Sequence, residues 1–75
     1  MKELVEYIAK AIVDKPEEVV VTEEVSDGRV TLRLKVATED TGKVIGKQGR
    51  IVQAIRSLVK VAAVKSGTRV VLEIV

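Results

Sequence analysis

The segment from Val30 to Ala37 alternates between apolar and polar side chains, and a β-branched run from Val19 to Val25 precedes it. Asp27 and Gly28 lie between the two runs, where they favour a tight turn. Because successive side chains of a strand point to opposite faces, the pattern predicts a β-hairpin with one buried face. The side chains expected on the buried face are Val30, Leu32, Leu34 and Val36, with Thr31, Arg33 and Lys35 on the open face.

A sheet with one buried face needs a covering layer, and three segments are expected to supply it. Lys2 to Val13 and Arg50 to Lys65 carry apolar residues at helical spacing, and Thr41 to Ile45 follows an acidic pair that suits a helix N-terminus. Pro16 stops the first helix. The sequence therefore predicts helices over these three segments.

Ser66-Gly67 ends the long helical segment, and Thr68 to Val75 reads as a third strand. The element order is then α-β-β-α-α-β. A crossover through two helices leaves the second and third strands parallel. We therefore expect an α+β fold with a three-stranded mixed sheet, three helices on one face, and a single domain over residues 1–75.

The stretch from Thr41 to Val52 contains three of the five glycines of the chain and three basic residues. Gly46 and Gly49 have no Cβ atom, so the backbone can approach a sugar-phosphate chain closely there. The free N–H groups that open the following helix favour an anion, and Lys47 and Arg50 add positive charge at the same place. This stretch is the strongest candidate for a binding site.

Two nucleotide-binding motifs do not fit this stretch. A Walker loop needs four residues before Gly-Lys-Ser/Thr, whereas three residues separate Gly42 from Gly46, and Gln48 follows Lys47. The dinucleotide fingerprint fails because no strand directly precedes a glycine turn. The chain also lacks Cys and His, which removes the usual nucleophiles and zinc ligands. We expect no catalysis, no cofactor and no metal.

Composition limits the compartment and the mode of nucleic-acid binding. No stretch of 18 apolar residues and no signal peptide is visible, so we expect no membrane association and a cytoplasmic location. Net charge is only +2, and Tyr7 is the one aromatic residue. Modules that stack bases on several aromatic rings are therefore disfavoured.

The sequence V-I-G-K-Q-G-R-I-V, set within the order α-β-β-α-α-β, closely resembles the KH domain. Gly46 and Gly49 match the two glycines of its Ile-Gly-x-x-Gly loop, Ile45 matches the preceding isoleucine, and Val52 matches the following aliphatic position. The leading helix and hairpin resemble the type II arrangement. In length the chain is similar to the small bacterial stand-alone KH proteins of the KhpA family.

The resemblance implies binding of single-stranded RNA in a groove for about four nucleotides, clamped by the glycine loop. It also suggests RNA-chaperone or post-transcriptional work linked to cell shape and cell wall biogenesis. Helical position adds Arg56, two turns beyond the loop, as a phosphate or base contact. The expected RNA-binding residues are Lys43, Val44, Ile45, Gly46, Lys47, Gln48, Gly49, Arg50, Val52 and Arg56.

The long helix offers a second surface. At about 100° per residue, its expected core face comprises Ile51, Ile55, Leu58, Val59 and Ala62. Nearly opposite lie Ala54, Ser57, Val61 and Val64. Small residues on this line favour a helix-to-helix dimer seam, although scattered surface valines are also common. The resemblance to KhpA adds an expected homodimer and a heterodimer with a KhpB/Jag-like KH protein.

Two alternatives to a stand-alone RNA-binding protein stay open. The chain is a protein-interaction module if the long helix is the functional surface and the groove is vestigial. It is a piece of a larger transcription or ribosomal factor if further domains accompany it. A complete element set that starts at Met1 favours the stand-alone protein.

Overall fold

The computed structural model covers residues 1–75 and has the expected order of elements. Three short 3-10 turns, η1, η2 and η3, connect the longer elements. The bounds are α1 Lys2–Ile12, η1 Pro16–Glu18, β1 Val20–Ser26, β2 Arg29–Lys35, η2 Thr38–Asp40, α2 Thr41–Ile45, η3 Lys47–Gly49, α3 Arg50–Ser66 and β3 Arg69–Ile74.

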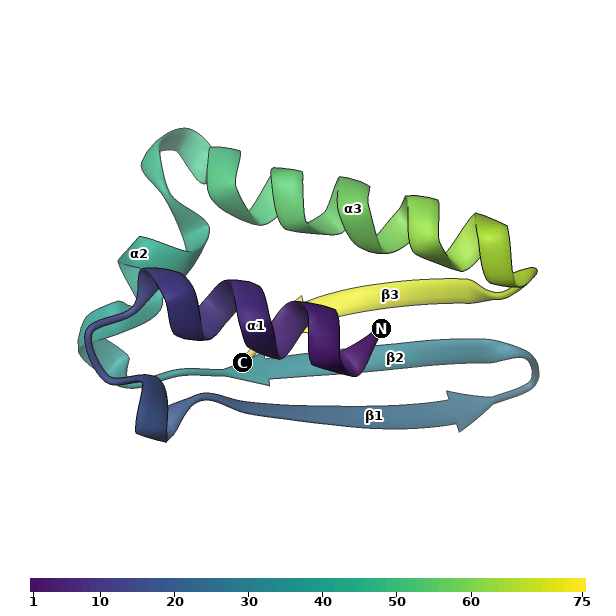
Figure 1. Cartoon of the computed structure of the whole chain (residues 1–75), viewed down its shortest axis with the longest axis horizontal. Helices are drawn as coiled ribbons and strands as arrows, with labels where there is room; N and C mark the ends of the chain where they lie inside the picture. Colours follow the sequence, from purple (N-terminus) through teal and green to yellow (C-terminus); the bar gives the residue numbers. More distant parts are fainter.

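The sheet is mixed, as the crossover predicted. Its order is β1-β2-β3, with β1 and β2 antiparallel and β2 and β3 parallel. The helices form a second layer over one face, with α1 and α3 lying along the sheet and α2 at one end of the layer (Figure 1). Both β1 and β3 are edge strands, and β3 is the one that runs beneath α3.

The alternation in β2 is confirmed. Its inward side chains are all buried, whereas Arg33 and Lys35 are exposed on the open face. The core joins these side chains to α1, α2 and α3. Its most completely buried apolar side chains are Val5, Leu32, Leu34, Val44, Ile55 and Val59.

The expected core face of α3 was wrong by part of a turn. The buried positions are Val52, Ile55, Val59 and Ala63, whereas Leu58 is 52% exposed and Ile51 is 36% exposed. Ten of the 17 residues of this helix are apolar and they extend around most of it, so their spacing alone does not show which arc faces the sheet. The consequence is a larger apolar surface outside the core than we expected.

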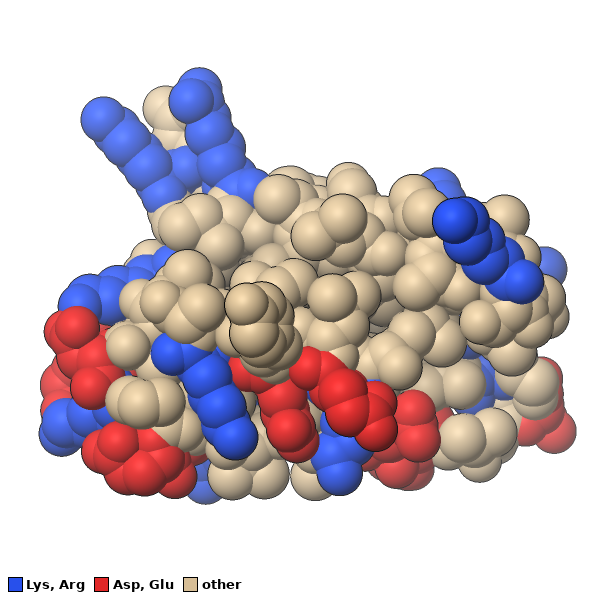
Figure 2. All heavy atoms as spheres, viewed as in Figure 1, with Lys and Arg blue, Asp and Glu red and all other residues tan.

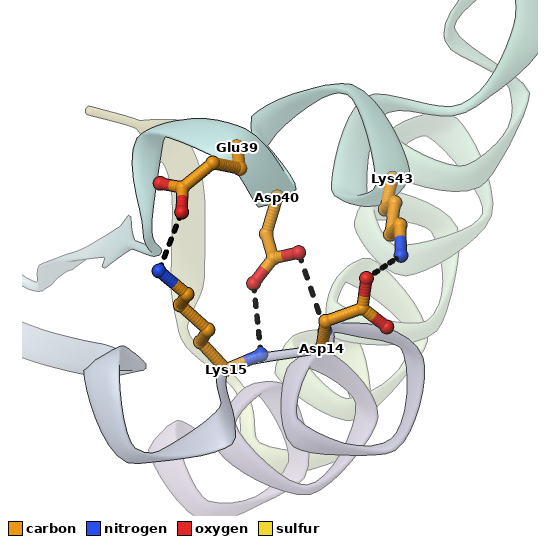
Figure 3. Close-up of polar contacts among 5 residues, drawn as sticks. All are labelled: Asp14, Lys15, Glu39, Asp40 and Lys43. Atoms are coloured by element: carbon orange, nitrogen blue, oxygen red, sulfur yellow. Dashed lines mark hydrogen bonds and ion pairs between the residues drawn. The ribbon is translucent and has the colours of Figure 1, made fainter.

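A buried carboxylate fastens the end of α1 to the start of α2 (Figure 3). Asp40 is 1% exposed, and its two oxygens accept hydrogen bonds from the backbone N–H groups of Asp14, at 3.2 Å, and Lys15, at 3.0 Å. Two ion pairs flank it, Lys15 to Glu39 at 2.5 Å and Lys43 to Asp14. We call these five residues the α1–α2 clasp. It fixes α2, and α2 in turn positions the glycine loop.

Replacing Asp40 by asparagine should lower the free energy of unfolding by about 1–3 kcal/mol, because the amide nitrogen cannot accept a hydrogen bond and one buried N–H loses its partner. In a domain of this size, that loss corresponds to a fall in Tm of roughly 4–24 °C. Thermal unfolding followed by circular dichroism measures it. Glu39→Gln is the control, because it breaks only an exposed ion pair and should cost less than about 1 kcal/mol. Equal losses in the two variants would contradict the role given to Asp40.

Candidate nucleic-acid interface

The loop between α2 and α3 has an unusual backbone. Gly46 has φ 78° and ψ 174°, Gln48 has φ 58° and ψ 26°, and Gly49 has φ 73° and ψ 14°. The conformation of Gly46 is essentially restricted to glycine, whereas the left-handed conformation of the other two is open to other residues at some cost. The loop therefore requires glycine more strictly at position 46 than at position 49.

Contacts separate the two glycines further. A Cβ atom on Gly46 would lie 2.5 Å from Cγ1 of Ile51, well inside van der Waals contact. The same atom on Gly49 would meet nothing closer than Cγ1 of Val52 at 3.9 Å. Gly46 thus lets the loop fold directly onto the first turn of α3, while Gly49 leaves open space above the helix start.

Positive charge surrounds this loop. Lys47, Gln48 and Arg50 are exposed, and a guanidinium nitrogen of Arg50 donates a hydrogen bond to the amide oxygen of Gln48 at 3.3 Å. The first turn of α3 contains no acidic residue, so the positive end of the helix dipole is not neutralised locally, although the N–H of Arg50 already donates to the carbonyl of Lys47. In Figure 2, basic side chains project from the corner of the molecule where α2 meets α3.

A groove of about 800 Å³ lies between α3 and the edge strand β3. From α3 it is lined by Arg56, Lys60, Ala63 and Val64, and from the strand by residues 69–73. Arg29 of β2 also reaches it. As an edge strand, β3 presents unpaired backbone N–H and C=O groups on its outer side. The groove thus combines basic side chains with a line of free backbone hydrogen-bonding groups.

The structure distributes the expected RNA-binding residues over four environments. Those of the loop, residues 45 to 50, form one surface, and Arg56 lies on the groove wall. Val44 is fully buried in the core and Val52 is 7% exposed, so they support the loop from beneath. Lys43 points toward α1, where its hydrogen bond with Asp14 raises the pKa of the lysine (Figure 3). Lys43 and Val44 are therefore poorly placed to contact a ligand at the loop.

Three basic residues of the groove were missed from the sequence: Arg29, Lys60 and Arg69. Lys60 was recognisable, because it lies one turn beyond Arg56 on the same side of a helix. Arg29 and Arg69 were harder, because they meet only through the parallel register of β2 and β3. The hairpin and the third strand do not specify that register by themselves.

The expected seam residues Ala54, Ser57 and Val61 are exposed on α3. Ile51 and Leu58 join them, and we call these five residues the α3 stripe. Val64 is also exposed, but it lies on the rim of the groove. The upper surface of the molecule in Figure 2, where α3 runs, is largely uncharged. No helix is both long and apolar enough to cross a membrane.

Known proteins similar to this chain place it in a family. The family model for the KhpA/KhpB KH domain matches residues 2–74. Proteins named RNA-binding protein KhpA are 60% identical in Clostridium perfringens and 59% identical in Caldanaerobacter subterraneus, each over 75 residues and the full length of both chains. The protein of that name from Listeria monocytogenes is 49% identical over 100% of this chain and 99% of its own length.

No solved structure shows a significant match to the chain. The full-length match to the family model and the identity to its relatives are nevertheless sufficient for an assignment, and the element order agrees with a KH fold. The chain belongs to the KhpA/KhpB KH-domain family, whose members are not enzymes.

Proposed function

We propose that this chain binds single-stranded RNA along a path that begins at the Gly46–Gly49 loop and continues in the groove between α3 and β3. The observation that carries the proposal is the continuity of positive charge from the loop along the groove. Lys47 and Arg50 stand at the loop, and Arg56 and Lys60 follow on α3. The one acidic residue of the groove, Glu73, is ion-paired with Arg33. Relatives named RNA-binding protein KhpA support the same class of ligand.

Phosphate groups would be held at the loop. The glycine backbone lets the RNA approach, the positive end of the α3 dipole favours a phosphate, and Lys47 and Arg50 supply charge. The bases would then lie in the groove beside Ile45, with their edges facing the free backbone groups of β3. Tyr7 is on α1 and does not line the groove, so base stacking on an aromatic ring plays no part.

A single copy should bind weakly and with modest salt sensitivity. Each phosphate contact contributes about −0.7 to the slope of the logarithm of the binding constant against the logarithm of the salt concentration, so two or three contacts give a total slope of about −1.4 to −2.1. Such reversible binding suits an RNA chaperone or a post-transcriptional regulator that contacts many transcripts briefly. Tighter binding would need a second RNA-binding surface linked to the first.

Replacing Lys47 and Gln48 together by aspartate should weaken RNA binding at least about tenfold, because two carboxylates would repel phosphates at the loop. Stability should change little, since both side chains are exposed and aspartate tolerates the left-handed conformation of residue 48. Fluorescence anisotropy with a labelled RNA octamer of randomised sequence measures the affinity, and thermal unfolding checks the fold.

The matched control for this variant is Thr22→Glu with Lys35→Glu. It changes the net charge by the same amount, on the open face of the sheet and away from the groove. RNA affinity should stay within about threefold of the wild type, as expected for a screened, distant charge. An equal loss of affinity in both variants would mean that net charge, and not the loop, determines binding, and the proposal would fail.

A second candidate function rests on the α3 stripe. Leu58 and Val61 are more than half exposed, and Ala54 and Ser57 beside them leave room for the close approach of another helix. We infer that this stripe packs against the same stripe of a second copy, or against a KhpB/Jag-like KH protein. Arg56 and Lys60 are each two residues from Leu58 and lie about 160° from it around α3, so a partner centred on Leu58 leaves the groove open to RNA.

A further inference from the structure

The groove is not confined to the side of the sheet that the helices cover. Two side chains of β3 point toward the helices: Leu72 belongs to the core, and Val70 packs against it. The alternate side chains, Arg69, Val71 and Glu73, point to the open face of the sheet. Both sets line the same groove. The groove therefore bends around the free edge of β3 and reaches the open face of the sheet.

Two arginines stand where the groove reaches that face. Arg29 of β2 and Arg69 of β3 are register partners in the parallel pair, so their side chains emerge on one face from adjacent strands, about 4.8 Å apart at the backbone. Both are exposed, and neither forms an ion pair. Like charges placed side by side on a sheet repel each other, so this pair is an unneutralised cationic site.

The neighbouring acids do not neutralise the pair. A second hollow of about 320 Å³ adjoins it and is lined by Glu24, Ser26, Asp27, Arg29, Thr31 and Arg69. Glu24 and Glu73 both bind Arg33, which is held between them across the three strands. Asp27 is in the hairpin turn and forms no ion pair with either arginine. Arg33 thus pairs with two of the three nearby carboxylates, Asp27 pairs with neither arginine, and Arg29 and Arg69 stay available.

We propose that the RNA passes beyond the four-nucleotide clamp, turns around the edge of β3 and places a further phosphate between Arg29 and Arg69. The inference rests on the proposed function and extends it to the length and path of the RNA. Guanidinium groups suit this role because their planar donors bind phosphate oxygens in pairs. Arg56 and Lys60 bridge the interval, so the phosphates meet basic side chains from the loop to the open face.

The test compares short and long RNA. Wild-type protein and the variant Arg29→Gln with Arg69→Gln are titrated with randomised RNA tetramers and octamers. The variant should match the wild type on tetramers and bind octamers about five- to tenfold more weakly. Its logarithmic salt slope on octamers should fall by up to about 1.4, at about 0.7 for each lost contact. The Tm should not fall, because a like-charge pair has been removed.

Lys10→Gln with Lys35→Gln is the matched control, since it removes two exposed charges that do not line the groove. It should leave both affinities unchanged. An unchanged octamer affinity in the arginine variant, or an equal loss on tetramers, overturns the extended path while the four-nucleotide groove stands. Wild-type protein that binds neither pool overturns the proposed function and the extended path together.

Discussion

Gly46→Ala should destabilise the protein by about 3–5 kcal/mol, whereas Gly49→Ala should cost about 1 kcal/mol. At Gly46, backbone strain of about 1–3 kcal/mol combines with an overpacking cost of similar size, because the new methyl group would lie 2.5 Å from Ile51. At Gly49 only the left-handed conformation is penalised, by about 1–2 kcal/mol, and the reduced freedom of the unfolded chain offsets part of that.

Thermal unfolding measures this difference. The fall in Tm should exceed about 12 °C for Gly46→Ala and stay near 4–8 °C for Gly49→Ala, given roughly 4–8 °C per kcal/mol in a domain of this size. The double variant Gly46→Ala with Ile51→Ala removes the contacts with Cγ1 and Cδ1 and keeps the one with Cβ at 2.8 Å, so it relieves part of the clash and leaves the strain. It should recover part of the lost stability. Equal losses at both glycines would show that the close approach of Gly46 to Ile51 is not what holds the loop.

Both variants should weaken RNA binding, but for different reasons. If Gly46 only shapes the loop, Gly46→Ala will weaken RNA binding by rearranging residues 46 to 49. Gly49 has open space beside it, so a methyl group there would meet the RNA and not the protein. Gly49→Ala should therefore lower RNA affinity with a smaller loss of stability than Gly46→Ala. The two glycines of one motif then have separable roles, one in folding and one in access.

The sheet was predictable because its two faces differ strongly. In β2 every second residue is buried, so a shift of one position would have exposed the whole apolar set. The glycine loop was recognisable from its spacing and its flanking aliphatic residues. These features are local, and a single sequence is enough to reveal them.

The features that escaped prediction depend on contacts distant in sequence. Asp40 looked like part of an acidic helix start, but its partners are backbone groups 25 and 26 residues earlier. The face of α3 was misjudged because Leu58 is as apolar as a core residue and yet lies outside the core. Arg29 and Arg69 come together only through strand register. In each case the position of the side chain depends on tertiary packing, which a local sequence pattern does not specify.

The exposed apolar surface of α3 leads to the second large prediction. Wild-type protein at about 100 µM should have about twice the 8.2 kDa monomer mass, and Val61→Asp should reduce it to the monomer mass. In a twofold dimer each substitution acts twice, so two carboxylates would be buried without partners. The dissociation constant should rise at least about 100-fold, or about 2.7 kcal/mol. Light scattering coupled to size-exclusion chromatography measures the mass.

Tyr7→Asp provides the matched control, because Tyr7 is also an exposed apolar residue on a helix but lies on α1, outside the stripe. It should stay dimeric. Because α3 is only about 25 Å long, an interface confined to it should be near the lower limit for stable association, and a dissociation constant in the micromolar range is expected. A monomeric wild type at this concentration, or a dimeric Val61→Asp, would rule out the seam. A monomeric variant that still binds RNA tetramers as well as the wild type would show that the stripe and the groove are independent surfaces of one helix.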